Sequence, residues 1–351
     1  MSAFLAAIGD NKLMPAPEAP SLVIPAQTGY VRNNQSWILG RVLRDFEHWM
    51  DEEIDNEDNK KLAALRKQKR TEAEQAHEEY NGEDVRIGLR LSVYEADPTQ
   101  HAGRPCRDRV WWTSIVVIFL QLGTSIVPFV LYHDWTVLFV TAAGSLLALA
   151  CGRLPQWRDE KWACRRETWK IVTLTAGNGQ KDCIVILGNG CGLDLEDLAT
   201  SRRVTKNTTR FALGLFSLGW IVLLISVAGF SQHTWYLIGV GGIGTIDNII
   251  IAGVARKPKA FGIHLKYKEV ILDRKVMDVL AEAERRYPHL GKSLLQTFFP
   301  GALRDREKAF WDYATRRASH FDAHWARDHS AEPGPLPSLR GDDKIPKDSL
   351  L

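Results

Sequence analysis

The sequence predicts an α-helical membrane protein with four transmembrane helices in two hairpins and a small cytosolic α+β region. Three observations predict this fold class. Four almost uncharged apolar blocks lie between residues 110 and 255, the links inside each pair of blocks are very short, and charged residues gather in the flanks and between the pairs. The averages hide this pattern, since 45% hydrophobic residues and a net charge of +3 are also typical of a soluble protein.

Each apolar block has the composition of a membrane span. Residues 111–132 contain no Asp, Glu, Lys or Arg, and 22 residues at about 1.5 Å each suffice to cross about 30 Å of hydrocarbon. Residues 135–152 and 211–230 are equally uncharged, and residues 235–255 contain one acid, Asp247. Backbone amides in lipid must be bonded within their own segment, so all four blocks are expected to be helices.

The basic residues predict the orientation of these spans. The central loop, residues 153–210, carries eleven Lys and Arg, whereas the links at 133–134 and 231–234 carry none. Further basic residues precede the first span and follow the fourth. The positive-inside rule therefore places both termini and the central loop in the cytosol of a multi-pass protein, without identifying the membrane.

These features divide the chain into seven segments. In order they are a flexible N-terminal segment (1–35), cytosolic helices and a strand (36–109), transmembrane hairpin 1 (110–152), a cytosolic loop with a β-hairpin (153–210), transmembrane hairpin 2 (211–255), a cytosolic strand with amphipathic helices (256–331) and a disordered tail (332–351).

The flanking segments show helix and strand periodicities. Apolar residues at helical spacing predict amphipathic helices over 36–50 and 272–283 and a further helix over 303–325. Alternating apolar residues predict strands near 87–93, 169–175, 183–187 and 263–267, with a hairpin turn at Gly177-Asn-Gly179. We expect one small sheet, built from segments before, between and after the spans. Residues 51–84 are crowded with charge and are expected to be a solvated helix or partly disordered.

Small residues predict how the spans pack. Helices in lipid approach one another closely where small side chains recur at every fourth position. Gly144, Ala148 and Gly152 do so on the second span, and Gly241 and Thr245 do so on the fourth.

Asp247 and its neighbour Asn248 form the candidate intramembrane polar site. An ionisable residue inside a span is costly, so it marks a functional hypothesis, here a proton or cation site with Gln121, Thr124 or Thr141 as polar partners. The alternative is a structural acid that is hydrogen-bonded between helices. One acid without an intramembrane Lys, Arg or His is a weak basis for a proton relay.

Gly188, Asn189, Gly190 and Gly192 form the candidate cytosolic turn, after a predicted strand and before a predicted helix. This setting resembles a phosphate-binding loop, but the glycine spacing and the absence of Gly-Lys-Ser/Thr argue against one. The acids Asp194, Glu196 and Asp197 are better explained as stabilising the start of the helix.

Other chemistry finds little support in the sequence. His320 and His324 share a helix face with His329 beyond, but Phe321 stands where a zinc-protease motif needs Glu, so no metal or cofactor is expected. No catalytic set is recognisable, which favours a protein that is not an enzyme. The small net charge and missing motifs argue against nucleic acid. The five cysteines are expected to be reduced.

Several short motifs together resemble a family of four-span integral membrane proteins from filamentous fungi that has no assigned biochemical role. The motifs are GYVR (29–32), SWILGR (36–41), SVYEADP (92–98), LPQW (154–157), EKW (160–162), GNG (188–190), LDLEDLA (193–199) and FFPG (298–301). The resemblance covers roughly residues 25 to 315. It implies a fungal membrane protein and provides no catalytic residue.

Three function classes remain open. The first is a membrane-anchored scaffold or accessory protein with a cytosolic surface that binds a protein partner. The second is an oligomeric transporter or channel component that uses Asp247, and the third is a membrane enzyme without a visible catalytic set. The expected partners are the lipid bilayer, anionic lipid head groups near the basic residues, and either another protein or further copies of this chain.

Overall fold

The computed structural model describes residues 12–50, 56, 59–61, 63–67, 71, 87–201, 205–230, 232–325 and 336. The chain divides into two compact units, each assembled from several stretches of sequence. The helical unit contains residues 1–16, 103–163 and 201–262, and the sheet unit contains residues 17–102, 164–200 and 263–351. Most of the charged stretch 51–84 and of the tail 332–351 lies outside the described residues.

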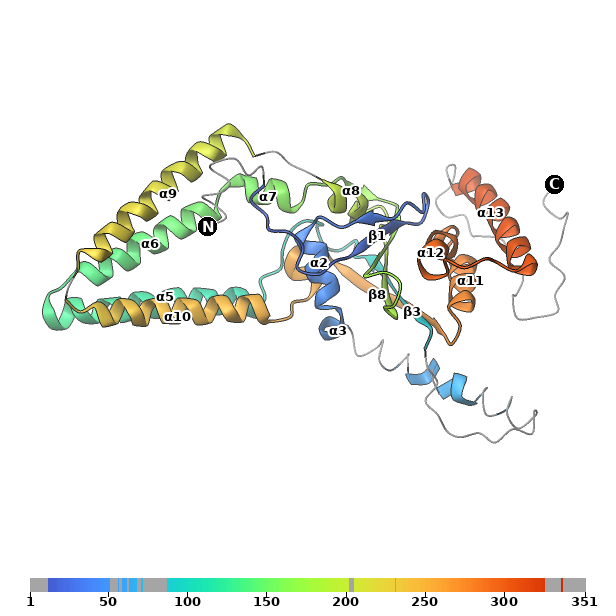
Figure 1. Ribbon diagram of the computed structural model, residues 1–351, viewed down its shortest axis with the longest axis horizontal. Coiled ribbons are helices and arrows are strands. Elements are labelled where there is room, and N and C mark those ends of the chain that lie inside the picture. Colours follow the sequence, from blue (N-terminus) through green and yellow to red (C-terminus); the bar gives the residue numbers. More distant parts are fainter. Residues whose placement is uncertain are drawn as a thin grey trace. The chain divides into compact units, whose positions relative to one another are not determined.

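Four long apolar helices dominate the helical unit (Figure 1), and they match the four predicted blocks. They are α5 (Arg109–Tyr132), α6 (Thr136–Gly152), α9 (Asn207–Ala228) and α10 (Thr234–Gly253). By length and composition, α5, α9 and α10 could each cross a membrane. Helix α6 qualifies only together with the short helix α7 (Pro155–Lys161), from which it is bent by 44°. Within the part of the chain that the structure describes, three helices could therefore span a membrane, or four if that bent pair is one span.

The four helices do not pack as two separate hairpins. Helix α5 contacts both α6 and α10, whereas α9 packs on α6 rather than on its successor α10. Figure 1 shows α9 beside α6 and α10 beside α5. The first predicted hairpin is thus a packed pair, while the helices of the second diverge and each takes a partner from the first.

The predicted small-residue faces are partly wrong. Gly144 lies against Leu223 and Trp220 of α9, as expected for a contact face. Gly152 and Gly241 face open space, so neither is a contact position. On α10 the contact lies one helical position away, at Val240 and Gly244. The reason is that small-residue spacing marks a face that can be approached but does not choose among neighbouring faces.

A six-stranded sheet organises the sheet unit. Its strand order is β2 (Arg32–Asn33), β1 (Leu22–Pro25), β5 (Ile171–Thr175), β6 (Asp182–Leu187), β3 (Leu89–Ala96) and β8 (Leu265–Asp273). Strands β3 and β6 are parallel, and every other neighbouring pair is antiparallel. A second small sheet pairs β4 (Arg166–Thr168) with β7 (Gly192–Leu193). The predicted sheet is therefore present, and it draws on all three regions of sequence.

Two elements differ from the predictions for residues 1–50. Residues 22–25 form β1, which pairs along its length with β5, so this part of the predicted flexible segment 1–35 is ordered. A four-residue strand bounded by prolines is too short to show a periodicity. The predicted helix over 36–50 is two helices, α2 (Trp37–Arg44) and α3 (Phe46–Trp49), because the helix is interrupted at Asp45.

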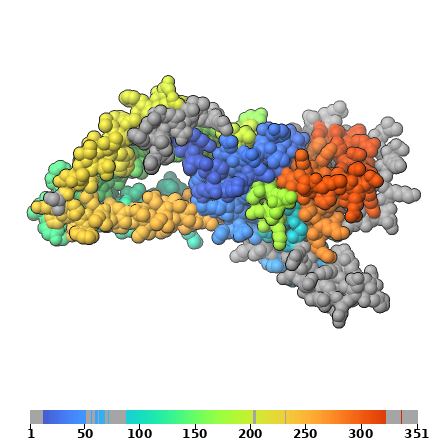
Figure 2. Space-filling view, in the orientation of Figure 1, coloured from blue at the N-terminus to red at the C-terminus, as the bar shows by residue number. Residues whose placement is uncertain are grey.

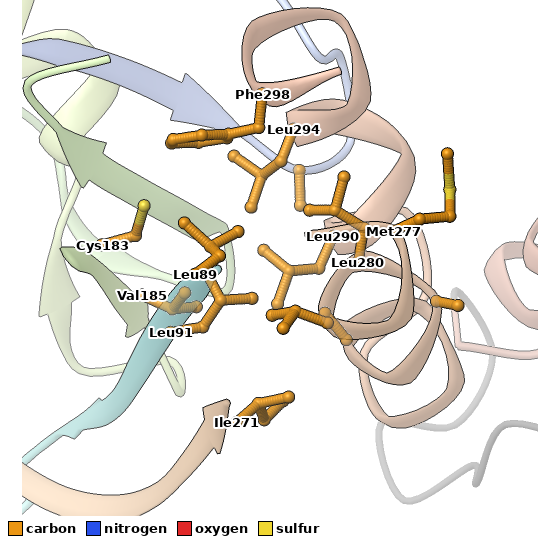
Figure 3. Close-up of a cluster of buried hydrophobic side chains, with 14 of the residues drawn as sticks. Leu89, Leu91, Cys183, Val185, Ile271, Met277, Leu280, Leu290, Leu294 and Phe298 are labelled. Atoms are coloured by element: carbon orange, nitrogen blue, oxygen red, sulfur yellow. The ribbon is translucent and has the colours of Figure 1, made fainter. Parts of the chain in front are cut away.

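Two C-terminal helices, α11 (Val276–Arg286) and α12 (Leu290–Phe298), pack on the six-stranded sheet. Helix α13 (Asp305–Trp325) is bonded to α11, since the Arg317 guanidinium donates to the Glu284 and Arg285 carbonyl oxygens, and α8 (Leu195–Thr200) follows β7. Figure 3 shows Leu89, Leu91 and Val185 of the sheet pointing toward Leu280 and Leu294 of the helices. These side chains form one contiguous core. Leu336, the only described residue of the tail, packs against the same core.

Candidate functional site

Of the polar residues that the sequence singled out as partners of Asp247, Gln121 lies at the α5–α10 contact. Gln121 Nε2 donates to the Val240 carbonyl oxygen at 3.0 Å and lies against Gly244. Thr124 and Thr141 donate to carbonyl oxygens of their own helices. The proposed polar partners of Asp247 thus bond to the backbone instead.

Asp247 and Asn248 lie on α10, one turn beyond Gly244. The Asp247 side chain is partly exposed and that of Asn248 is exposed. Neither forms a side-chain hydrogen bond or ion pair with any other residue that the structure describes. The structural alternative, an acid bonded between helices of one chain, is therefore not what the described residues show.

A small polar cluster joins the two links at the far end of the bundle. His233 Nδ1 lies 3.1 Å from Asp134 Oδ2, and the Tyr132 ring stacks on the imidazole with centroids 4.2 Å apart. The Asp134 carboxylate also accepts hydrogen bonds from the Thr136 hydroxyl and the Thr136 amide, and these bonds, together with that from His233, lower its pKa. Sequence analysis missed this cluster, although a His and an Asp in two facing links were a visible signal.

The opposite end of the bundle is strongly basic. Residues 104–109, 153–163, 205–210 and 256–259 carry eleven Lys and Arg against three acids. Those acids are already engaged. Asp159 pairs with Lys206 at 3.1 Å, Glu160 accepts the amides of Leu13 and Met14, and Asp108 pairs with Arg256 at 2.6 Å. Within these stretches, cations therefore outnumber carboxylates.

Lys161 has the most unusual environment in this basic end. Its Nζ lies 5.0 Å from the centroid of the Trp162 ring and 5.8 Å from that of Phe261, and the Trp162 indole N–H donates to the Phe261 carbonyl oxygen. Burial, followed by repulsion from Arg256, lowers the pKa of Lys161 to about 8. The amine forms no hydrogen bond or ion pair with the residues that the structure describes.

Arg256 is held in place beside Lys161. Its guanidinium makes a bidentate pair with Asp108, which also caps the start of α5 by accepting the Trp111 amide, and its Cζ lies 5.3 Å from the Phe261 ring centroid. Burial opposes ionisation of Asp108, but these bonds outweigh it and lower the carboxyl pKa. The pair fixes a second cation at the end of α10.

The glycines of the candidate turn at Gly188 allow close packing against Thr168 and Trp169. An added Cβ would meet the Thr168 carbonyl oxygen at 2.2 Å at Gly188 and the Trp169 ring at 2.6 Å at Gly190, which also has φ +71°. Asn189 is left-handed with φ +53°. The amides of Gly188, Gly190 and Gly192 all donate to backbone carbonyls, so they are not available to cradle a phosphate.

The acids after this turn are neutralised by neighbouring cations. Asp194 Oδ1 accepts the amides of Glu196 and Asp197 at the start of α8, as predicted. Lys170 pairs with Asp194 and Glu196, at 2.9 Å and 2.7 Å. For Glu196, burial is outweighed by the bonds from Lys170 and Arg32, which lower its pKa. These ion pairs join the acids at the start of α8 to Lys170 and Arg32, and Asp194 occupies the amides of Glu196 and Asp197.

Within the part of the chain that the structure describes, no group of three or more His, Cys, Asp or Glu side chains could hold a metal ion. The side chain of His324 and all of His329 lie outside the described residues. The five cysteines are free, and burial raises the pKa of the Cys183 thiol to about 12. No family model, curated protein or solved structure matches the chain.

Proposed function

We propose that the chain is a four-span integral membrane protein that anchors a cytosolic interaction module, and that it acts as a scaffold or accessory protein. In this account α5, α6, α9 and α10 cross the bilayer, both termini are cytosolic, and the sheet unit is the module that binds a partner. The same assignment fits the resemblance to the four-span fungal family.

One observation carries the proposal. The long apolar helices keep their large side chains on the outside, since no more than 11% of each qualifying window is buried. Figure 2 shows α9 and α10 lying open along the surface of the helical unit. Phe119, Leu131, Phe211, Leu224 and Trp235 are all more than half exposed. Patches of this size are unfavourable in water and are favourable in hydrocarbon.

The distribution of charge supports the orientation. The basic excess lies at one end of the bundle, where α5 and α9 begin and where α6 and α10 end. The links at the other end carry no Lys or Arg. This asymmetry is what the positive-inside rule requires for a cytosolic basic end.

Membrane extraction tests the anchoring. The chain should remain in the pellet when membranes are washed with alkaline carbonate, and it should enter solution only with detergent. Release by carbonate alone would contradict the proposal.

The scaffold role is tested separately. Capture of the full chain from mild detergent should recover one protein partner in fixed stoichiometry. That partner should be lost when exposed residues of the sheet unit are changed and retained when exposed residues of the spans are changed.

A transporter or channel component is the second candidate, because Asp247 has no partner among the described residues. An unpaired acid within a span marks an ion or proton pathway by default. Asp247→Asn should abolish ion or proton flux in reconstituted vesicles while leaving folding unchanged if this candidate is right. If flux is absent in the wild type, or is equal in both, the scaffold role stands.

A further inference from the structure

Two aromatic rings lie near the Lys161 amine, and none of the described carboxylates pairs with it. We propose that Lys161, supported by Arg256, binds the phosphate of an anionic phospholipid at the cytosolic end of the bundle. This inference rests on the proposed membrane function and identifies one of its partners.

Charge is the first argument. Each described carboxylate of the four basic stretches already has a partner, since Asp108 holds Arg256, Asp159 holds Lys206 and Glu160 accepts two backbone amides and the Gln156 side chain. The Lys161 amine is half-buried, and burial of a charged group without a carboxylate partner costs free energy. An incoming anion offsets that cost. A phosphate supplies the missing charge together with several acceptor oxygens.

Position is the second argument. Arg256 follows the end of α10 by three residues, Asp108 immediately precedes α5, and Lys161 ends α7, just beyond α6. If the four helices span the bilayer, these residues lie at the level of the head groups of the cytosolic leaflet. Anionic lipids concentrate in that leaflet, and basic residues near its surface attract them by about 1 kcal/mol each.

The surrounding rings distinguish a lipid from a free anion. Trp162 and Phe261 both lie against the Lys161 amine, and Trp111 lies under Arg107 with 4.7 Å from the guanidinium carbon to its ring centroid. Tryptophan favours the boundary between head groups and acyl chains. A phospholipid therefore presents phosphate to the cations and glycerol to the rings, which inorganic phosphate cannot do.

Lipid retention by the purified full chain tests the proposal. The protein is solubilised in a mild nonionic detergent, mixed with phosphatidic acid or phosphatidylcholine, and analysed by native mass spectrometry. In detergent the membrane surface potential is absent, so only a built site retains lipid. The wild type should retain one phosphatidic acid in preference to phosphatidylcholine, and Lys161→Met should weaken this by about tenfold.

Lys259→Ala is the matched control, because Lys259 is an exposed lysine of the same basic end. It should change retention by less than about twofold. Equal retention by wild type and Lys161→Met, or an equal loss with Lys259→Ala, would overturn the proposal. So would complete displacement of the lipid by millimolar inorganic phosphate, which would assign the site to a free anion.

A charge-retaining variant separates binding from folding. Lys161→Arg should retain phosphatidic acid, and wild-type retention should fall relative to that of this variant as the pH passes about 8, since the lipid ionises identically in both samples. If the chain stays in the pellet after the carbonate wash but Lys161→Met retains as much lipid as the wild type, only this inference is rejected. Release by carbonate would reject the proposed function itself.

Discussion

Leucines of the two units have opposite surroundings. In the sheet unit, Leu89 and Leu91 are fully buried among the side chains of α11 and α12, whereas Leu224 of the helical unit is 70% exposed. The residue type is the same, so the difference lies in what each unit places around it. Burial of apolar side chains stabilises a fold in water, and the proposed membrane function would place the exposed side chains of the helices in hydrocarbon.

Truncating one leucine in each unit tests this contrast and should give the largest effect. Leu91→Ala removes a fully buried side chain from the core and should destabilise the sheet unit by about 4 kcal/mol. Leu224→Ala, the matched change on α9, should cost less than about 0.5 kcal/mol in detergent. Denaturant unfolding followed by circular dichroism measures both. A similar loss for the two variants would mean that Leu224 is packed against something.

Glycines give a second, smaller contrast. A Cβ at Gly291 would meet the Leu280 carbonyl oxygen at 1.9 Å, so Gly291→Ala should push α11 and α12 apart at a cost of about 3 kcal/mol. Gly123 of α5 has open space around its missing side chain, and Gly123→Ala should cost nothing. Thermal melting in detergent compares the two. An unaffected Gly291→Ala would show that the helices can separate freely.

A buried carboxyl predicts how the sheet unit responds to pH. Burial raises the pKa of Glu284, although the amides of His289 and Lys292 bond to its carboxylate and oppose the shift. The folded state therefore holds this proton more firmly than the unfolded state, and stability is lost as the pH rises through the folded pKa.

Glu284→Gln removes that titration. As the pH is lowered from neutral toward the usual carboxyl range, the free energy of unfolding of the wild type should rise relative to that of the variant. The gain is on the order of 1 kcal/mol for each unit by which the folded pKa of Glu284 exceeds its unfolded pKa. Melting temperatures of both proteins across this range test the sign. A wild type that loses stability relative to Glu284→Gln on acidification would show that the amide bonds outweigh burial.

The smallest expected effect lies inside the bundle. Gln121→Leu removes the hydrogen bond from α5 to the Val240 carbonyl oxygen, and such bonds contribute about 0.6 kcal/mol in membrane helices. Thr124→Val is the control, because Thr124 bonds only within α5. Titration of the detergent-solubilised protein with dodecyl sulfate measures helix separation. A larger loss with Thr124→Val would place the α5–α10 contact elsewhere.

The sequence predicted the elements more successfully than their packing. The absence of charged residues located α5, α6, α9 and α10. Alternating apolar residues on either side of Gly177-Asn-Gly179 located the β5–β6 hairpin, because both signals are local. Strand β1 was missed because its partner, β5, lies about 150 residues away in sequence. The pairing of α9 with α6 was missed because chain order favours neighbours but does not require them.

The site residues show the same limit. The sequence located Asp247 because a lone acid in an apolar run is conspicuous, and it located the basic runs by counting charge. It gave Lys161 no special role, since Trp162, Phe261 and Arg256 surround its amine only after folding. The engagement of Asp159 and Glu160 by distant partners was likewise invisible, and because of it the lysine pairs with no carboxylate among the described residues.

Membrane topology is the measurement that tests the account most directly. In a background without native cysteines, single cysteines replace Lys181, in the turn between β5 and β6, and Gln232, in the second link; both positions are exposed. Sealed vesicles with the cytosolic face outward are treated with a maleimide that does not cross membranes. We expect Lys181→Cys to be labelled at once and Gln232→Cys only after detergent. Labelling of both without detergent, or protection of Lys181→Cys, would contradict the four-span account.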